Sequence, residues 1–177
     1  IKKNNKKQNH IKVYGKNYLN PLKINVGGDP SSAAFFTALT LLIPNACLKI
    51  KHVGLNSRRI GFYNLLKKYG AKIKFKNVKK INHEYVGDIE IQSSKLKPIR
   101  ASSDYYGSAT DEYPILFVIA ALTKGISVFK GIEDLANKES NRIEEMKKIL
   151  NQIGIKCQST KSEMKIFGVT ELKKKKY

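Results

Sequence analysis

Asp29-Pro30-Ser31-Ser32 opens a run of apolar residues that extends to Leu42, and a similar opening recurs at Thr110-Asp111-Glu112-Tyr113-Pro114. After each opening the chain passes through a β-rich stretch into an amphipathic segment that ends at a glycine. The first segment ends at Tyr69-Gly70-Ala71 and the second at Ile153-Gly154-Ile155. Internal repetition of this kind indicates one supersecondary unit used twice. We therefore predict a fold built from two copies of that unit.

Each copy begins with a helix that is apolar on every face. Asp29 is a suitable N-cap for the first helix, and Pro30 suits the first helical position because its missing N–H costs nothing there. The corresponding helix of the second copy is expected from Asp111 to about Thr123. A helix that is apolar all round is normally buried all round. The sequence therefore predicts one fully buried helix in each copy.

The second helix of each copy is amphipathic, and short strands surround it. The amphipathic helices are predicted at 60–69 and 143–153 from apolar residues that recur at helical spacing. Strands, predicted from alternating or hairpin-like patterns, fall at 47–51, 72–75, 88–92, 126–130, 155–158 and 164–167, and a further short strand is predicted at 11–15, ahead of the first copy. The unit is thus a buried helix, a strand, an amphipathic helix and two strands. Buried helices imply sheets on the outside and helices within, the reverse of a doubly wound fold.

The chain is strongly basic: 34 Lys and Arg residues oppose 14 Asp and Glu residues, for a formal net charge of +20. Nucleic-acid binding is one interpretation, because Lys and Arg neutralise phosphates. However, the lysines are spread along the chain, and no helix-turn-helix, zinc-finger or aromatic single-strand motif accompanies them. A solvated lysine-rich surface, or a field that steers a small anionic substrate, explains the charge as well. We expect no nucleic-acid partner, with a basic binding module as the alternative of a different class.

Other features of the composition favour a cytoplasmic protein without a membrane span. The longest apolar run, 114–122, is too short to cross a bilayer and suits a buried helix. Cys47 and Cys157 lie far apart without metal-ligand spacing, which fits a reducing compartment. No His, Cys or carboxylate cluster indicates a metal site, so none is predicted. Because the chain begins with Ile1, we expect an internal segment of a longer protein.

Lys138-Glu139-Ser140-Asn141-Arg142 is a dense charged cluster that only the second copy carries. Lys138 and Arg142 are four residues apart, so a continuous helix would place both cations on one face. Two cations at a helix start suit an anion, and Glu139 between them could relay a proton. The alternative is a solvated helix start with an intrahelical ion pair. The equivalent stretch of the first copy, 55–59, has no carboxylate.

Asp111 is the candidate catalytic carboxylate of the second copy. An Asp at a helix start is most simply an N-cap, because its carboxylate accepts hydrogen bonds from unpaired backbone N–H groups. Asp29 is expected to be such a cap. The charged cluster at 138–142, present only in the second copy, favours a catalytic role for Asp111.

Three motifs in order along the chain resemble 5-enolpyruvylshikimate-3-phosphate (EPSP) synthase, especially the bacterial class with an Asp-Glu-Tyr-Pro motif. They are Gly28–Phe35, Thr110–Leu116 and Lys138–Arg142. The resemblance runs from about Leu22 to Phe167. It implies an α/β (α+β) fold, an inside-out barrel of repeated β-α-β-α-β-β units with buried helices. It also implies that 1–55 end a first lobe and that 56–177 belong to a second lobe, with repeat units at about 56–100 and 101–168.

The same resemblance implies a reaction of the shikimate pathway, which leads to chorismate and the aromatic amino acids. The enolpyruvyl group of phosphoenolpyruvate would pass to the 5-hydroxyl of shikimate 3-phosphate, with release of phosphate and no cofactor. Asp111 would contact the shikimate hydroxyls and accept a proton, and Lys138 would bind the shikimate phosphate. Arg142 would bind phosphoenolpyruvate, and Glu139 would bind it too and take part in proton transfer at its methylene carbon.

The resemblance also has gaps. The family's N-terminal Lys and Arg motifs, its Ser-Ser/Ala-Gln segment and its C-terminal Asp-His-Arg motif have no counterpart here, and Asn141 stands where the family usually has Asp. We therefore expect this segment to hold one wall of the cleft and to be inactive alone, with a monomeric full-length protein. The alternative enzyme is the transferase that acts on UDP-N-acetylglucosamine, against which the Lys-Glu-Ser and Asp-Glu-Tyr-Pro combination argues.

Overall fold

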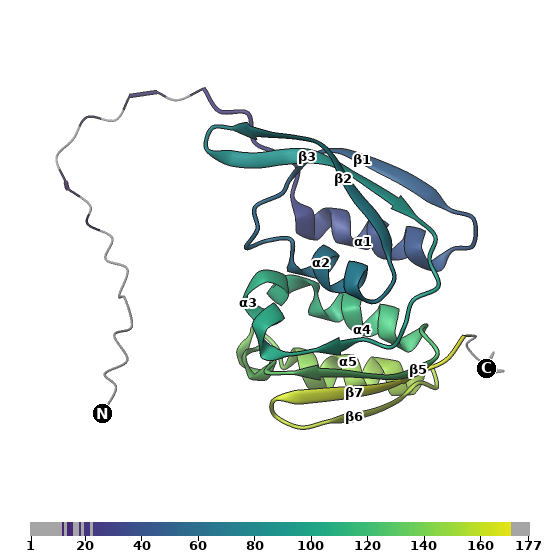
Figure 1. The fold of residues 1–177 in the computed structure, drawn as a ribbon. Coiled ribbons are helices and arrows are strands. Elements are labelled where there is room, and N and C mark those ends of the chain that lie inside the picture. The colour runs from purple at the N-terminus through teal and green to yellow at the C-terminus, as the bar shows by residue number, and fades with distance from the viewer. Residues whose placement is uncertain (1–11, 13, 16–17, 19, 22, 171–177) are drawn as a thin grey trace, which may run out of the picture.

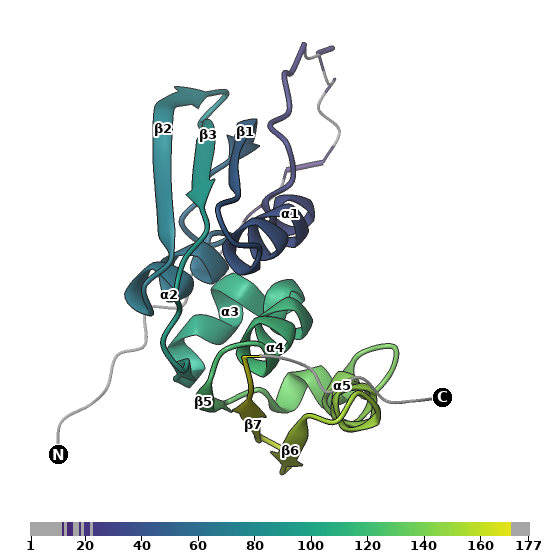
Figure 2. The same cartoon turned by 90° about the vertical axis from the view of Figure 1, so that its right-hand side faces the viewer.

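A computed structural model of the chain describes residues 12, 14–15, 18, 20–21 and 23–170. Figure 1 shows two β-sheets on opposite sides of a layer of helices, and the view turned by 90° in Figure 2 shows the same order of layers. The predicted arrangement of outer sheets and inner helices is confirmed. In the part of the chain that the structure describes, no helix is long and apolar enough to cross a membrane.

The first unit contains two helices and one three-stranded antiparallel sheet. Its elements are α1 (Pro30–Leu42), β1 (Cys47–Gly54), α2 (Gly61–Lys68), β2 (Lys72–Ile81) and β3 (Glu84–Gln92). The strand order is β1-β3-β2, and Gly28 forms a parallel bridge with Val53 just before α1 begins. The predicted boundary between the two lobes, at 55/56, falls between β1 and α2, inside this unit. The assignment of the two sides to lobes stays a prediction.

The second unit repeats this arrangement with a four-stranded sheet. Its elements are β4 (Arg100–Ala101), η1 (Ser103–Tyr105), α3 (Tyr106–Ala109), η2 (Thr110–Glu112), α4 (Tyr113–Ala121), β5 (Gly125–Lys130), η3 (Glu133–Asn137), α5 (Arg142–Gln152), β6 (Lys156–Ser159) and β7 (Glu163–Gly168). The strand order is β4-β5-β7-β6, and β4 pairs with β5 in parallel. The parallel contact of Gly28 with Val53 is the first unit's version of that pairing. Both units therefore follow a β-α-β-α-β-β path.

The two units share one hydrophobic core. Leu65 and Leu66 of α2 are fully buried in the same cluster as Leu116 and Phe117 of α4. The Phe117 and Phe129 rings meet edge to face with centroids 5.0 Å apart, a favoured aromatic geometry. Because one cluster spans both units, the helices that carry the candidate site are fixed relative to each other.

Of the two helices predicted to be buried on every face, α1 is buried on one face only, and α4 is buried except at Pro114 and Val118. Phe35 of α1 is 66 % exposed, Leu39 is 57 % exposed, and Val118 of α4 is 41 % exposed. The buried face of α1 consists mainly of small residues, such as Ala34 and Ala38, which allow close approach to its neighbours. The larger side chains of α1 and α4 line an apolar groove of about 480 Å³. The prediction of complete burial is wrong because an apolar surface does not specify which element covers it.

Candidate functional site

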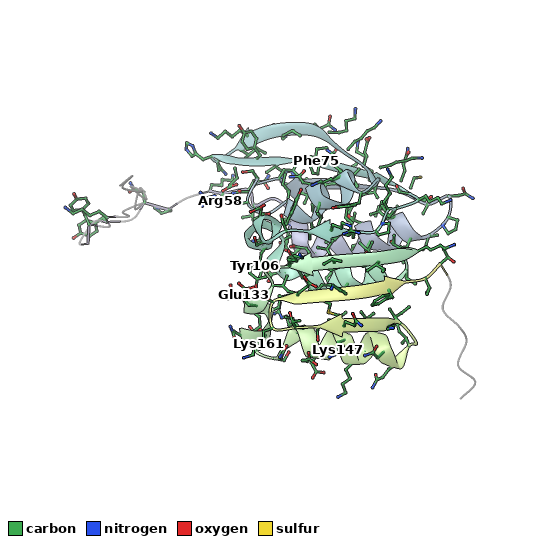
Figure 3. All side chains as sticks on the ribbon, turned by 60° about the horizontal axis from the view of Figure 1, so that its bottom comes forward. Arg58, Phe75, Tyr106, Glu133, Lys147 and Lys161 are labelled. Atoms are coloured by element: carbon green, nitrogen blue, oxygen red, sulfur yellow. The ribbon has the colours of Figure 1, made fainter. Side chains whose placement is uncertain are left out.

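A cleft of about 290 Å³ opens where the two units meet, at the start of α4. Its lining residues are Arg58, Arg59, Gly107, Ser108, Thr110, Asp111, Glu112 and Lys138. They come from the loop before α2, from α3 and η2, and from the end of η3. Figure 3 shows Arg58, Tyr106 and Glu133 along the same edge of the molecule, and these residues belong to or adjoin the segments that form the cleft. Cations and carboxylates thus face one small space.

Asp111 lies in η2, and its side chain is 63 % exposed. No side-chain hydrogen bond caps the start of η2 or of α4, so Asp111 is not an N-cap. Its carboxylate Oδ1 instead lies 3.8 Å from Nη1 of Arg142. The carboxylate is therefore accessible to a ligand in the cleft.

Asp29, the equivalent residue of the first unit, is the N-cap that the sequence predicts. Its carboxylate accepts hydrogen bonds from the backbone N–H groups of Ser31 at 3.3 Å and Ser32 at 2.9 Å. Pro30 occupies the first helical position of α1, as expected. Two aspartates at matching positions therefore have different surroundings: one is engaged with a helix start, and the other faces the cleft.

Arg142 connects two of the predicted site residues. Its Nη2 donates to Oε2 of Glu139 at 3.2 Å, while Nη1 faces Asp111. The pKa of Glu139 lies below its ordinary value. The largest cause is a hydrogen bond from the backbone N–H of Glu139 to its own carboxylate, and the next causes are the hydrogen bond from Arg142 and the charge of Arg142. Glu139 is therefore ionised at neutral pH, and a single guanidinium lies between two carboxylates.

Lys138 and Arg142 do not share a helical face, so that expectation is wrong. Helix α5 begins at Arg142, and Lys138 follows η3 in extended conformation, with φ −81° and ψ −171°. The physical reason is Asn141, whose side chain accepts a hydrogen bond from the Glu144 backbone N–H at 3.2 Å and caps α5. A side-chain cap sets the first helical residue. Lys138 reaches the cleft from the loop instead, beside Asp111.

The first unit contributes two cations to the cleft, Arg58 and Arg59, which the sequence pattern does not single out. Arg58 and Arg59 belong to the stretch 55–59, which corresponds to the 138–142 cluster. Because that stretch lacks a carboxylate, the sequence predicts no site residue in it. Arg59 pairs with Asp29 at 3.2 Å. Within the described ranges, neither Arg58 nor Lys138 has an ion pair within 4.0 Å. The signal that could have identified Arg58 is its position in the repeat, because it lies in the first copy's equivalent of the 138–142 cluster.

The donor set of the cleft suits anions rather than metals. Among the residues that the structure describes, no group of three or more His, Cys, Asp or Glu side chains could hold a metal ion. Arg58, Arg59 and Lys138 offer N–H donors that match phosphate or carboxylate oxygens. Asp111 offers a carboxylate that can exchange protons, and Glu139, which is not among the lining residues, is connected to it through Arg142. The arrangement can therefore orient a small anion next to proton-transfer groups.

Comparisons with known proteins agree with the motifs. The sequence model of the family described as EPSP synthase (3-phosphoshikimate 1-carboxyvinyltransferase) matches residues 1–176. The 3-phosphoshikimate 1-carboxyvinyltransferase of Zymomonas mobilis is 37 % identical over 158 residues, which are 89 % of this chain and 35 % of that protein. The enzyme of the same name from Bacillus subtilis is 35 % identical over 166 residues, 94 % of this chain and 39 % of that protein.

A solved structure supports the same relationship. The structure of EPSP synthase from Acinetobacter baumannii superposes with a TM-score of 0.80 at 36 % identity, over 84 % of this chain and 34 % of that one. The chain thus spans little more than a third of the length of these relatives. The predicted fold, of the enolpyruvyl transferase kind, and the resemblance on which it rested are confirmed. The chain belongs to the EPSP synthase family.

Proposed function

We propose that this chain forms one wall of the active site of a 3-phosphoshikimate 1-carboxyvinyltransferase. The full-length protein would transfer the enolpyruvyl group of phosphoenolpyruvate to the 5-hydroxyl of shikimate 3-phosphate and release phosphate. The observation that carries the proposal is the meeting of Asp111 and Lys138 in one cleft, with Arg142 between Asp111 and Glu139. Membership of the family supplies the reaction, and this geometry supplies residues with the required chemistry.

Binding of the substrates follows from charge. Both substrates carry phosphate and carboxylate groups, so a cleft lined by cations attracts and orients them. Lys138 is assigned to the phosphate of shikimate 3-phosphate, and Arg142 to phosphoenolpyruvate. Arg142 now pairs with two carboxylates, so it would exchange those partners for the substrate. The other anion-binding groups would come from parts of the full-length protein outside this chain.

Proton transfer is assigned to the two carboxylates. The 5-hydroxyl oxygen attacks C2 of phosphoenolpyruvate and gives its proton to Asp111, while the methylene carbon gains a proton from Glu139. The intermediate then returns a proton from its new methyl group to Glu139 and releases phosphate, which restores the carbon–carbon double bond, and the proton held by Asp111 leaves with the phosphate. The pKa of Glu139 is lowered while Arg142 is its partner. Capture of Arg142 by an incoming anion removes that partner and adds negative charge, and both changes raise the pKa of Glu139 toward proton uptake.

The remaining parts of the proposal concern the setting of the enzyme. We propose a monomeric cytoplasmic protein with small anionic substrates and no nucleic-acid or membrane partner. Cys47 and Cys157 are both free thiols, which suits a reducing compartment. The 177-residue chain alone is expected to be inactive, since it would contribute only part of the cleft.

The test is Asp111→Ala in the full-length protein. Because Asp111 is assigned as the proton acceptor, kcat should fall by about 10²–10⁴-fold, the usual contribution of such a group. Phosphate release is measured with shikimate 3-phosphate and phosphoenolpyruvate, and circular dichroism checks that the fold is kept.

Asp104→Ala is the matched control. Asp104 is an exposed carboxylate of η1 in the same unit, outside the cleft lining, and it accepts a hydrogen bond from Ser102. The kcat of the Asp104→Ala variant should stay within about threefold of the wild-type value. Near-normal kcat in Asp111→Ala would exclude the assigned role. Turnover of UDP-N-acetylglucosamine in place of shikimate 3-phosphate would assign the protein to the other enolpyruvyl transferase.

A further inference from the structure

We infer that Glu112 is a positioning residue: Ser31 of the first unit anchors its carboxyl group, and this contact holds η2 so that Asp111 faces the cleft. The inference rests on the proposed function, because it concerns the residue assigned as proton acceptor. It adds two residues, Glu112 and Ser31, whose effect on the reaction would pass through Asp111.

Glu112 is held by a directional hydrogen-bond chain. It is only 3 % exposed, and the Ser31 hydroxyl donates to its Oε1. Arg59 Nη2 in turn donates to the Ser31 hydroxyl oxygen at 3.1 Å and to Asp29 at 3.2 Å. A guanidinium can only donate, so the single proton of the Ser31 hydroxyl is directed to Glu112. The carboxyl group of Glu112 is thus the acceptor at the end of the chain.

Ser31 is a well-fixed anchor in the first turn of α1. Asp29 caps that helix, and the Tyr63 hydroxyl donates to the Pro30 carbonyl at 2.6 Å. Tyr63 is fully buried. The position of Ser31 is therefore set by the first unit, and its contact with Glu112 transfers that position to the second unit.

Asp111 has no comparable support of its own. Its carboxylate makes no capping hydrogen bond, and its partner Arg142 is 3.8 Å away. Its direction therefore depends on the backbone of η2. In a 3₁₀ turn successive side chains point about 120° apart, since the turn contains three residues. An inward-facing Glu112 consequently directs Asp111 outward, and both residues border the same cleft.

A contribution to the stability of the fold does not by itself explain why Glu112 is buried. Burial raises the pKa of its carboxyl group, and the hydrogen bond from Ser31 opposes that rise. Burying an ionisable group costs free energy, and a well-packed apolar side chain at such a place is often as stable or more so. A buried carboxyl group next to the assigned proton acceptor is therefore better explained by a requirement of the site.

The experiment compares five variants of the full-length protein. Glu112→Ala and Ser31→Ala each break the contact, so each should lower kcat by about 10- to 100-fold, as expected when a reacting group is misplaced. Because both remove one interaction, the double variant should lose no more than the worse single variant. Glu112→Gln keeps an acceptor oxygen for Ser31 and should hold kcat within about threefold. Thr40→Val is the control, because it removes a hydrogen bond within the same helix, from the Thr40 hydroxyl to the Phe36 carbonyl at 2.7 Å, without touching Ser31 or Glu112, and it should leave kcat within about twofold.

Hydrogen–deuterium exchange of the amides at 106–113 gives a readout that does not require turnover. Exchange should rise in Glu112→Ala and Ser31→Ala and stay at the wild-type level in Glu112→Gln and Thr40→Val. The inference is overturned if Glu112→Ala keeps kcat, if Glu112→Gln loses as much as Glu112→Ala, or if exchange is unchanged. If the wild type fails to turn over its substrates, the proposed function fails, and the exchange pattern still decides whether Glu112 holds η2.

Discussion

Asp29 and Asp111 occupy equivalent places in the two units, and only their neighbours distinguish them. The carboxylate of Asp29 is engaged by the helix start of α1, whereas that of Asp111 is exposed and faces Arg142. The repeat pattern predicts the position of both residues and the cap at Asp29. The role proposed for Asp111 depends on Arg142 and Lys138, which lie far along the chain and approach it only in the fold.

Asp29→Ala is expected to lower the unfolding free energy by about 1 kcal/mol at pH 7, because it removes an N-cap. Burial raises the pKa of Asp29, but hydrogen bonds from Ser32 and Ser31 and the charge of Arg59 outweigh that effect, and the pKa lies below its ordinary value of 3.8. A carboxyl group with a lowered pKa stabilises the fold above its unfolded pKa, and this contribution is lost as the pH falls through the folded pKa.

The stability difference between wild type and Asp29→Ala should therefore be full at pH 7 and smaller at about pH 3. Urea unfolding of the full-length protein at the two pH values measures it. An equal difference at both values would show that the charge of Asp29 adds nothing to the cap.

At the scale of elements, the contact between α2 and α3 connects the packing of the helices to the cleft. Gly61, the first residue of α2, lies directly against Ser108 of α3, and Ser108 borders the cleft. A Cβ on Gly61 would lie 2.8 Å from the Ser108 carbonyl carbon, closer than real Cβ atoms approach. The start of α2 therefore sets the place of α3.

Gly61→Ala should destabilise the protein by about 1–3 kcal/mol, the usual cost of overpacking. It should also lower kcat, because α3, which carries Gly107 and Ser108 of the cleft lining, must shift. Thermal unfolding and phosphate release measure the two effects. Gly107→Ala is the matched control for stability: Gly107 is a glycine of α3 whose Cβ would meet nothing within 4 Å, and alanine favours helix by up to about 1 kcal/mol. Equal stability of the two variants would contradict the close contact.

The elements themselves were largely predictable, because helix caps and apolar periodicity are local. The six strand stretches predicted between 47 and 167 all overlap observed strands, and 72–75 pairs with 88–92 as expected. The strand predicted at 11–15 lies partly outside the described residues, and residues 12, 14 and 15, which are described, are not in a strand. The strands extend further than predicted, through irregularities at His52 and Asn77, which have positive φ. Asp88 supports both irregularities, accepting from the His52 backbone N–H at 3.1 Å and from the Asn77 amide at 2.7 Å. Such support comes from another strand, so a local pattern cannot reveal it.

At the scale of the whole molecule, the least predictable feature is the exposed apolar groove between α1 and α4. The chain spans little more than a third of its relatives, and the apolar side chains of the groove lie on the open side of the helical layer. Exposed apolar surfaces of this kind are typical of faces that pack against another segment or partner. Sequence periodicity predicted the apolar residues correctly and could not show that these side chains stay exposed in the part of the chain that the structure describes.

We expect the 177-residue chain, produced alone, to bind the dye ANS and to self-associate through this groove. Phe35→Lys and Leu39→Lys place charges in it and should lower dye fluorescence and the apparent mass by light scattering. Val78→Lys is the control, because Val78 is 51 % exposed and lies on β2, away from the groove. Fluorescence that falls equally in all three variants would mean that the dye does not report on the groove.

The contact between Ser31 and Glu112 has a consequence for how such a protein can evolve. One copy of a duplicated unit provides the proposed chemistry, and the other copy provides its scaffold, so neither copy is free to diverge independently. A chimaera that exchanges only one unit with a relative combines an anchor and an acceptor that have not been selected together. Exchange of both units as a single block preserves the pair. The heritable module is therefore the pair of units, although the sequence repeats at half that length.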